Sequence, residues 1–417
     1  MPLPNDRGLL HLFRSGGAPL MIIGLLGRLP TAMTPMLLLV AIPIGGGSLT
    51  QAGAAVGSAA LGTATSGVVV GLLIDRFGAR LIVTLIAVIQ SAALIGLAVQ
   101  FGSLEDTLML LVLAFVVGVS NPAIGALGRA AWARRADAGE LDPPAMRSAM
   151  AWEASSSEAA FVIGPVTASL LLSVIEPRTA LIGLALVGFV IHLEFVRLVP
   201  LHVATGAGAH PGRRGAPSRS VLDAKEVRRP ALVASAALLL ATSVGLVFGS
   251  VQASLNAVFA ALEVPALVGL VYGVMGAGSI LGGLVWAQIP DRARGAWVIP
   301  VAGVVLTGVG VLVLSAGSLG FAASCVVCAV VGLWLSPVLG EAYYQTRAAV
   351  SEKFKVTMMT VFASGTSVGV GIGAPLASGL ATLGEPQYGF LGVVVAGVAF
   401  LVGGGCLLRQ EGGGPPN

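Results

Sequence analysis

Long apolar stretches alternate with short polar turns along almost the whole chain. A membrane-spanning helix needs about 20 apolar residues, because each residue adds about 1.5 Å to a helix that crosses about 30 Å of hydrocarbon. The pattern therefore predicts an all-α membrane protein with twelve transmembrane helices. We expect them at residues 19–43, 50–74, 81–99, 107–130, 148–173, 179–199, 231–260, 265–289, 296–315, 319–344, 356–383 and 388–408.

A polar, basic stretch rich in Gly, Pro and Ser separates the first six predicted spans from the last six. It predicts two six-helix bundles, residues 1–199 and 231–417, joined by a cytoplasmic basic linker over residues 200–230. The two halves also share short motifs. Ile163-Gly164-Pro165 in the fifth span corresponds to Gly373-Ala374-Pro375 in the eleventh.

The composition supports a lipid environment. The 417 residues are 56% hydrophobic and 10% charged, whereas soluble domains are about 25% charged. The first apolar run is longer than the core of a cleavable signal peptide, so we expect it to remain as the first span. Arginine greatly outnumbers lysine, and Ala, Gly and Val are abundant, which favours a bacterium with a GC-rich genome.

The basic residues predict the orientation. With the N-terminus inside, all but two of the 23 lysines and arginines fall on the cytoplasmic side, where such residues concentrate. The exceptions are Arg178, outside, and Arg28, within the first span. The distribution predicts that both termini are cytoplasmic. Together with the composition, it favours a multi-pass protein of a bacterial inner (plasma) membrane.

The turn after the second span carries Gly71, Asp75, Arg76, Gly78 and Arg80. This pattern resembles the loop between helices 2 and 3 of the major facilitator superfamily. The resemblance implies a secondary transporter with its substrate site between the two halves near mid-membrane. It also implies that Asp75 contacts the start of the eleventh span and steadies the outward-open state. An ordinary charged cytoplasmic turn is the alternative.

The fifth span resembles that of drug–proton antiporters of the superfamily. Their motif has a Gly-Pro pair, matched here by Gly164 and Pro165, and small residues occupy its other glycine positions. Small residues let membrane helices pack closely. The fourth span departs from those antiporters, because Ala114 stands where they have an arginine.

Arg28 is the most prominent charge within a predicted span. Counted from the span ends, Arg28 and Glu158 both lie about 15 Å deep, whereas Glu153 lies nearer the cytoplasmic face and about 140° around the helix from Glu158. An intramembrane charge is expected to have a partner. We therefore expect an Arg28–Glu158 pair, with Glu153 as the other candidate. Such a pair either couples protons to transport or locks the two spans together permanently.

In the superfamily, spans 1, 4, 7 and 10 line the cavity. Polar stripes on membrane helices face a cavity or another helix, and apolar walls with few polar groups suit a hydrophobic ligand. The residues expected to line the cavity are Thr31, Asn121, Gln252, Asn256, Trp334 and Glu341.

Motifs for other chemistries are absent from the sequence. It has no phosphate-binding G-x4-G-K-[ST] loop and no H-E-x-x-H motif, and its four histidines are scattered. Cys325-Val-Val-Cys328 lies in an apolar run, which favours buried thiols over a redox or metal site. We expect no enzymatic activity, cofactor, metal or nucleic-acid partner.

The sequence thus favours a monomeric transporter that exports a small, mostly apolar compound, such as a drug, antibiotic or secondary metabolite, in exchange for protons. The alternatives are uptake of a small metabolite by the same fold, or a membrane receptor or scaffold that transports nothing.

Overall fold

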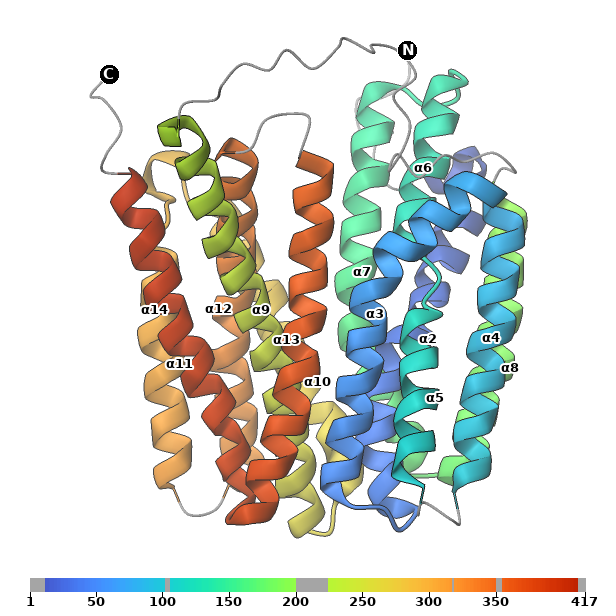
Figure 1. Cartoon of the computed structure of the whole chain (residues 1–417). Coiled ribbons are helices and arrows are strands. Elements are labelled where there is room, and N and C mark those ends of the chain that lie inside the picture. Colours follow the sequence, from blue (N-terminus) through green and yellow to red (C-terminus); the bar gives the residue numbers. More distant parts are fainter. Residues whose placement is uncertain (1–11, 102–105, 200–223, 317–318, 350–354, 412–417) are drawn as a thin grey trace.

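The computed structural model describes residues 12–101, 106–199, 224–316, 319–349 and 355–411. These residues form helices that run side by side along one axis (Figure 1). In chain order, the elements are η1 (Phe13–Gly17), α2 (Ala18–Ile44), α3 (Leu49–Phe77), α4 (Ala79–Gln100), α5 (Thr107–Val119), α6 (Ile124–Asp137), α7 (Pro143–Leu172), α8 (Pro177–Leu198), α9 (Ala224–Ala261), η2 (Pro265–Leu267), α10 (Val268–Gln288), η3 (Asp291–Ala293), α11 (Val298–Ser315), α12 (Phe321–Ala349), α13 (Lys355–Leu383), η5 (Pro386–Phe390) and α14 (Leu391–Glu411).

Within the described residues, eleven helices are long and apolar enough to cross a membrane. A twelfth candidate is the bent helix α3, whose segments Leu49–Gly67 and Val69–Phe77 meet at 42°. The predicted fourth span is also interrupted, since α5 ends at Val119 and α6 begins at Ile124. Pro122 lies in the break and has no backbone N–H to donate, which explains why a continuous helix is disfavoured there. The chain is therefore an all-helical integral membrane protein.

Local sequence signals account for the helix ends nearest the candidate site. Asp142 caps α7 by accepting a hydrogen bond from the Ala145 backbone N–H at 2.8 Å, and Pro143 begins the helix, a position that suits proline. Gly78 connects α3 to α4 with a φ of +87°. A residue with a Cβ is strained in that conformation, which explains the glycine in this turn.

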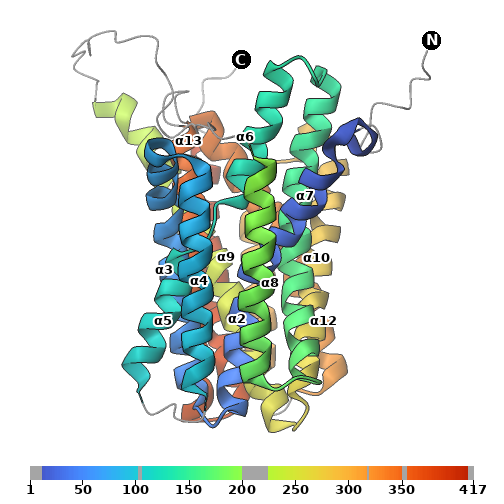
Figure 2. The ribbon, with the colours of Figure 1, turned by 90° about the vertical axis from the view of Figure 1, so that its right-hand side faces the viewer.

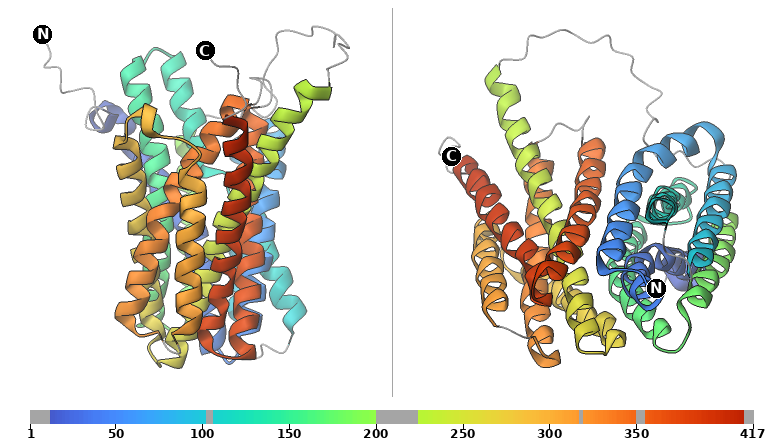
Figure 3. Two further views of the ribbon diagram at one scale, coloured as in Figure 1. Left: turned by 90° about the vertical axis from the view of Figure 1, so that its left-hand side faces the viewer. Right: turned by 60° about the horizontal axis from the view of Figure 1, so that its bottom comes forward.

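The helices of each half pack mainly among themselves. In the first half, α2 packs against α7 and α8, and α4 packs against α5 and α8, an arrangement visible from the side in Figure 2. In the second half, α9 packs against α13 and α14, and α10 against α12. Figure 3 shows the two groups of helices side by side. The boundaries predicted for the bundles and the linker remain a prediction, and residues 200–223 lie outside the described part of the chain.

Most contacts between the halves come from two pairs of helices, α3 with α13 and α7 with α10. The backbones come close at glycines. A Cβ on Gly57 would lie 2.8 Å from the Gly371 carbonyl oxygen, and one on Gly269 would lie 2.5 Å from that of Pro165. Such contacts are possible only with small residues, as in other membrane helix pairs.

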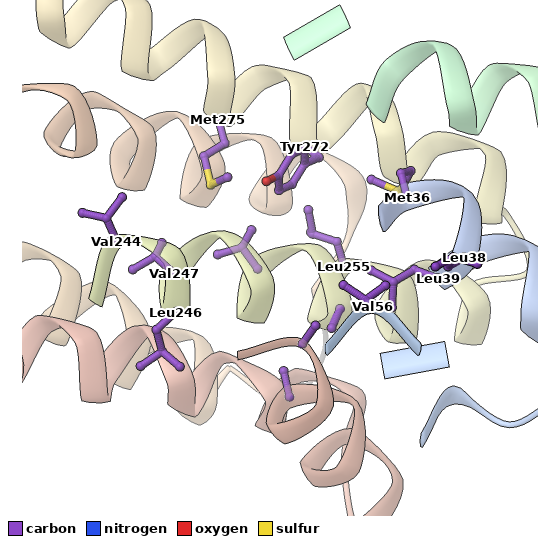
Figure 4. Packing of buried hydrophobic residues seen from close by; sticks show 14 of the residues in the cluster. Met36, Leu38, Leu39, Val56, Val244, Leu246, Val247, Leu255, Tyr272 and Met275 are labelled. Atoms are coloured by element: carbon purple, nitrogen blue, oxygen red, sulfur yellow. The ribbon is translucent and has the colours of Figure 1, made fainter. Parts of the chain in front are cut away.

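One hydrophobic core continues across both halves. It includes Leu39 of α2, Val56 of α3 and Leu255 of α9, and Figure 4 shows these side chains beside one another. A second cluster belongs to the first half alone and includes Trp132 and Phe195. The first core packs the two halves together, whereas the second surrounds the buried charges described below.

Candidate functional site

A buried ion pair joins α2 to α7. Arg28 donates through Nη2 to Oε2 of Glu153, and the side chains are only 9% and 1% exposed. Arg28 also donates through Nη1 to the Gly24 carbonyl oxygen at 2.7 Å and through Nε to Ser157 Oγ at 3.2 Å. The second carboxylate oxygen of Glu153 accepts a hydrogen bond from Trp132 Nε1 at 3.0 Å. Both charged groups are therefore partnered inside the protein, as burial of ions requires.

Two glycines of α6 make room for this pair. A Cβ on Gly128 would lie 2.7–3.0 Å from the Glu153 carboxyl group, and one on Gly125 would lie 3.3 Å from Nη2 of Arg28. Gly125 and Gly128 are three residues apart and so lie on the same side of the helix. The helix that follows the break in the fourth span thus closes over the ion pair.

The prediction that Arg28 pairs with Glu158 was wrong, because the structure pairs Arg28 with Glu153. The error arose because the start of the fifth span was predicted too late in the sequence. The sequence placed that start at Ser148, but the Asp142 cap and Pro143 begin the helix five residues earlier. Glu153 is ten residues from Pro143, and Arg28 is ten residues from Ala18. With the true helix ends, Glu153 matches Arg28 in depth.

Glu158 lies on a different face of α7. It is exposed and is four residues before Val162, which packs against Gly276 of α10 in the other half. Residues four apart share a helix face, so Glu158 faces the boundary between the halves. Among the described residues, Glu158 has no hydrogen-bond or ion-pair partner.

Arg129 is a second intramembrane cation that sequence reasoning assigned to a cytoplasmic loop. It belongs to α6 within a candidate span, and its guanidinium, like that of Arg28, lies beside Gly125. Arg129 interacts electrostatically with Glu153, Arg28 and Tyr343, which is on α12 in the other half. It is exposed and forms no hydrogen bond or ion pair with a described residue.

The residues expected to line a cavity have several different environments. Thr31 donates a hydrogen bond to Asn121 Oδ1 at 2.9 Å, beside the break between α5 and α6. Asn256 is 2% exposed and donates to the Leu39 carbonyl oxygen at 2.6 Å, so it joins the halves. Gln252 and Glu341 are buried, and Glu341 accepts a hydrogen bond from Gln345 at 2.8 Å.

Trp334 is half-buried and packs against the main core. Its place there and the buried side chains of Gln252 and Glu341 do not by themselves test cavity lining, which stays a prediction for these residues.

The motif after the second span occupies the α3–α4 turn at the upper end in Figure 1. Gly71 is buried, whereas Asp75, Arg76 and Arg80 are exposed. The latch partner expected for Asp75, the first turn of α13, has side chains outside the described residues. The latch therefore stays a prediction.

The Gly164-Pro165 motif lies where three helices meet. A Cβ on Gly164 would lie 2.7 Å from that of Ala32 on α2, while the Pro165 carbonyl oxygen lies against Gly269 of α10. Ser169, one turn further on, donates to the Ala266 carbonyl oxygen at 2.8 Å. The motif thus packs α7 onto its own half and onto the other half at once.

The described residues contain no group of three or more His, Cys, Asp or Glu that could hold a metal ion. The three cysteines are free thiols. Buried His192 bonds through Nε2 to the Gly27 carbonyl oxygen at 3.1 Å, which links α8 to α2 next to Arg28.

Sequence reasoning missed several functional candidates, namely Arg129, Trp132, Ser157 and Tyr343. The helical spacing of the residues around Trp132 and Ser157 could have identified these two residues from the sequence. Ser157 follows Glu153 at a spacing of four residues, and Gly125 and Gly128 precede Trp132 on one side of α6. Nothing in the sequence indicated that Tyr343 of the second half lies near Arg129.

Comparison with known structures shows the same fold. The nucleoside transporter NupG (D323A mutant) superimposes with a TM-score of 0.69 at 14% identity, covering 94% of this chain and 99% of that one. A bacterial homologue of the human lysosomal transporter Spinster, in an inward-facing and occupied conformation, gives 0.65 at 15% identity, covering 96% and 97%. An auto-inhibited POT family peptide transporter gives 0.63 at 14% identity, covering 94% and 97%.

No curated protein matches the sequence of this chain. At the level of families, residues 20–352 match the Major Facilitator Superfamily. That match extends over most of the chain and agrees with the all-helical fold and its structural neighbours. The chain therefore belongs to the Major Facilitator Superfamily.

Proposed function

We propose that the chain is a secondary active transporter that exports a small, mostly apolar compound in exchange for protons. We further propose that it works as a monomer in a bacterial inner membrane, with twelve spans and both termini in the cytoplasm. Family membership and fold support secondary transport. The Gly164-Pro165 motif and its resemblance to antiporters support the direction and the coupling.

The observation that carries the proposal is the Arg28–Glu153 pair. Ionisable side chains within membrane spans are costly and mark ion or substrate pathways. Glu153 is a carboxylate held between two helices by donors from α2 and α6, Arg28 and Trp132. A proton on this carboxylate removes its charge and weakens its bond to Arg28. Protonation of Glu153 in one conformation and its release in the other would couple proton flow to movement of α7 against α2.

The contacts between the halves support a two-state cycle. Ser169, Asn256 and Ser364 make hydrogen bonds between the halves. They lie from the middle of the helices to the end where α2 turns into α3, the lower end in Figure 1. Glu158 lies at the middle of α7 and Arg129 lies in α6, and both are exposed. Alternating access requires contacts between the halves to open on one side of the membrane while they close on the other.

Transport in proteoliposomes tests the proposal. Purified protein is reconstituted with the pH dye pyranine inside, and ethidium, Hoechst 33342, uridine and a dipeptide are supplied one at a time. We expect at least one hydrophobic dye to move against its gradient when a pH gradient is imposed. Glu153→Gln should abolish pH-driven movement and keep exchange of the same compound across the membrane. Glu140→Gln, an exposed surface control, should retain both activities.

Three results would overturn parts of the proposal. Movement of uridine or dipeptide together with protons would favour the uptake alternative. A complete absence of flux for protein that is folded and inserted would favour a receptor or scaffold. Unchanged pH-driven flux in Glu153→Gln would exclude Glu153 as the coupling residue and turn attention to Glu158.

A further inference from the structure

Two opposite charges on the first half have no hydrogen-bond or ion-pair partner among the described residues. Glu158 of α7 and Arg129 of α6 both belong to candidate spans, and both are exposed. Neither forms a hydrogen bond or an ion pair within the described part of the chain. The Arg28–Glu153 pair, which lies beside Arg129, is instead held by several hydrogen bonds. Glu158 and Arg129 therefore differ from the hydrogen-bonded pair, although Arg129 also interacts electrostatically with Glu153 and Arg28.

Both charges face the second half. Glu158 shares its helix face with Val162 and Val166, and these two residues contact Gly276 and Gly273 of α10. Arg129 and Glu158 each interact electrostatically with the same residue of the second half, Tyr343 of α12. Their side chains thus point into the region between the halves, which the family uses for its substrate site.

An aromatic surface lies opposite the charges. The rings of Tyr343 and Phe362 pack with their centroids 3.9 Å apart at an angle of 39°. Phe362 is buried, but Tyr343 is only half-buried. Gly340, one turn before Tyr343, is exposed, and a Cβ there would meet nothing within 4 Å. Open space therefore lies beside Gly340, one turn from Tyr343.

The ligand is inferred from the charges of Glu158 and Arg129, which form no ion pair with a described residue. A charged side chain within a membrane span is expected to have a partner of opposite charge. We propose that this transporter binds an amphoteric aromatic compound between its halves, with a cationic amine at Glu158, an anionic group at Arg129 and its ring against Tyr343. The ligand is still largely apolar, because only its two ends are charged.

The separation of the two ends can be estimated from the helix geometry. Glu158 is five residues from Glu153, which is about 7.5 Å along the helix axis. The Arg129 guanidinium lies beside Gly125, one turn of α6 from the Gly128 that contacts the Glu153 carboxyl group. The charged groups of the ligand should therefore be separated by several ångströms.

Binding of matched probes tests the proposal, which rests on the proposed function for the location of the site. The probes are 4-(aminomethyl)benzoate and 4′-(aminomethyl)biphenyl-4-carboxylate, each with its methyl ester, its N-acetyl derivative and the doubly blocked neutral compound. Affinity is measured by calorimetry on purified full-length protein without a pH gradient. We expect at least one amphoteric probe to bind about tenfold more tightly than either singly blocked form, which corresponds to about 1.4 kcal/mol.

The variants identify each end of the site. Glu158→Gln should remove the preference for the free amine and keep that for the carboxylate, and Arg129→Gln should do the reverse. Glu158→Asp and Arg129→Lys keep the charges and should keep both preferences. The surface controls Glu140→Gln and Arg197→Gln should bind like the wild type. Since neither Glu158 nor Arg129 makes a described hydrogen bond, all these variants should fold.

Equal affinity for all four forms of both probes would overturn the proposal, as would unchanged preferences in Glu158→Gln and Arg129→Gln. The binding experiment and the transport assay can fail independently of each other. Selective binding without proton-driven flux would support the ligand assignment and refute coupling. Proton-driven flux of dyes with no selectivity among the probes would do the opposite.

Discussion

Breaking the Arg28–Glu153 pair should destabilise the protein much more than neutralising both partners. In Glu153→Gln, Arg28 remains 9% exposed with only Gly24 and Ser157 as described partners. Removing one member of a buried ion pair costs about 3–5 kcal/mol, because the other charge is left uncompensated. Arg28→Gln should have a similar effect, since it leaves the buried Glu153 with Trp132 as its described donor. The double variant buries no charge at this place and should recover most of the loss.

The expected shift in melting temperature follows from the size of the chain. Unfolding entropy is about 2.1 cal/mol/K per residue, so for 417 residues each kcal/mol changes the melting temperature by about 1 °C. The single variants should melt about 3–6 °C below the wild type, and the double variant should melt within about 2 °C of it.

A thiol-reactive dye suits this measurement, because Cys328 is 0% exposed and becomes reactive only on unfolding. Glu140→Gln and Arg135→Gln neutralise a partly exposed pair and should change the melting temperature by less than about 1 °C. If the melting temperature of the double variant falls by the sum of the two single decreases, Arg28 and Glu153 do not interact. That result would refute the buried pair.

Three further predictions concern the contacts between helices. Gly269→Val places side-chain atoms against the Pro165 carbonyl oxygen, which is 2.5 Å from the Cβ position, so it should force α10 away from α7 and increase the labelling of cysteines introduced nearby. The control Gly308→Val, whose Cβ meets nothing within 4 Å, should leave the labelling unchanged. Equal labelling in the two variants would contradict the packing. Asp75→Asn should slow transport without changing the melting temperature, because a carboxylate near a helix N-terminus contributes only about 0.3–1 kcal/mol. The test is crosslinking between the end of α3 and the start of α13. Crosslinking equal to that of the wild type would argue against the latch. Gly78→Ala should cost about 1–2 kcal/mol, since φ is +87° there, and a melting temperature no lower than that of Gly308→Ala would contradict it.

The order of apolar and polar residues was enough to predict an all-helical membrane protein. The apolar stretches indicated the helices because only helices satisfy every backbone hydrogen bond in lipid without a partner strand. The motif containing Gly78 indicated a sharp turn and the family, and both the turn and the family are confirmed. These features depend on local chemistry, and local chemistry can be inferred from residues that are near one another in the chain.

The partner of Arg28 depended on tertiary structure. Depth along a helix follows from sequence only if the helix end is known, and a shift of five residues replaces Glu158 by Glu153 and turns the helix by about 140°. The Asp142-Pro143 start signal was present in the sequence, but it lies outside the apolar run. Hydropathy measures where a helix enters lipid, whereas the helix itself begins at its cap.

The contacts between the halves were not predictable from the sequence alone. Arg129 and Tyr343 lie more than 200 residues apart in the chain, and their proximity depends on how α6 and α12 face each other across the two bundles. Asn256 has the polarity of a cavity residue but bonds to the backbone of α2. Sequence gives the chemical character of each helix face, and only the packing of the helices decides whether that face meets another helix, lipid or the space between the halves.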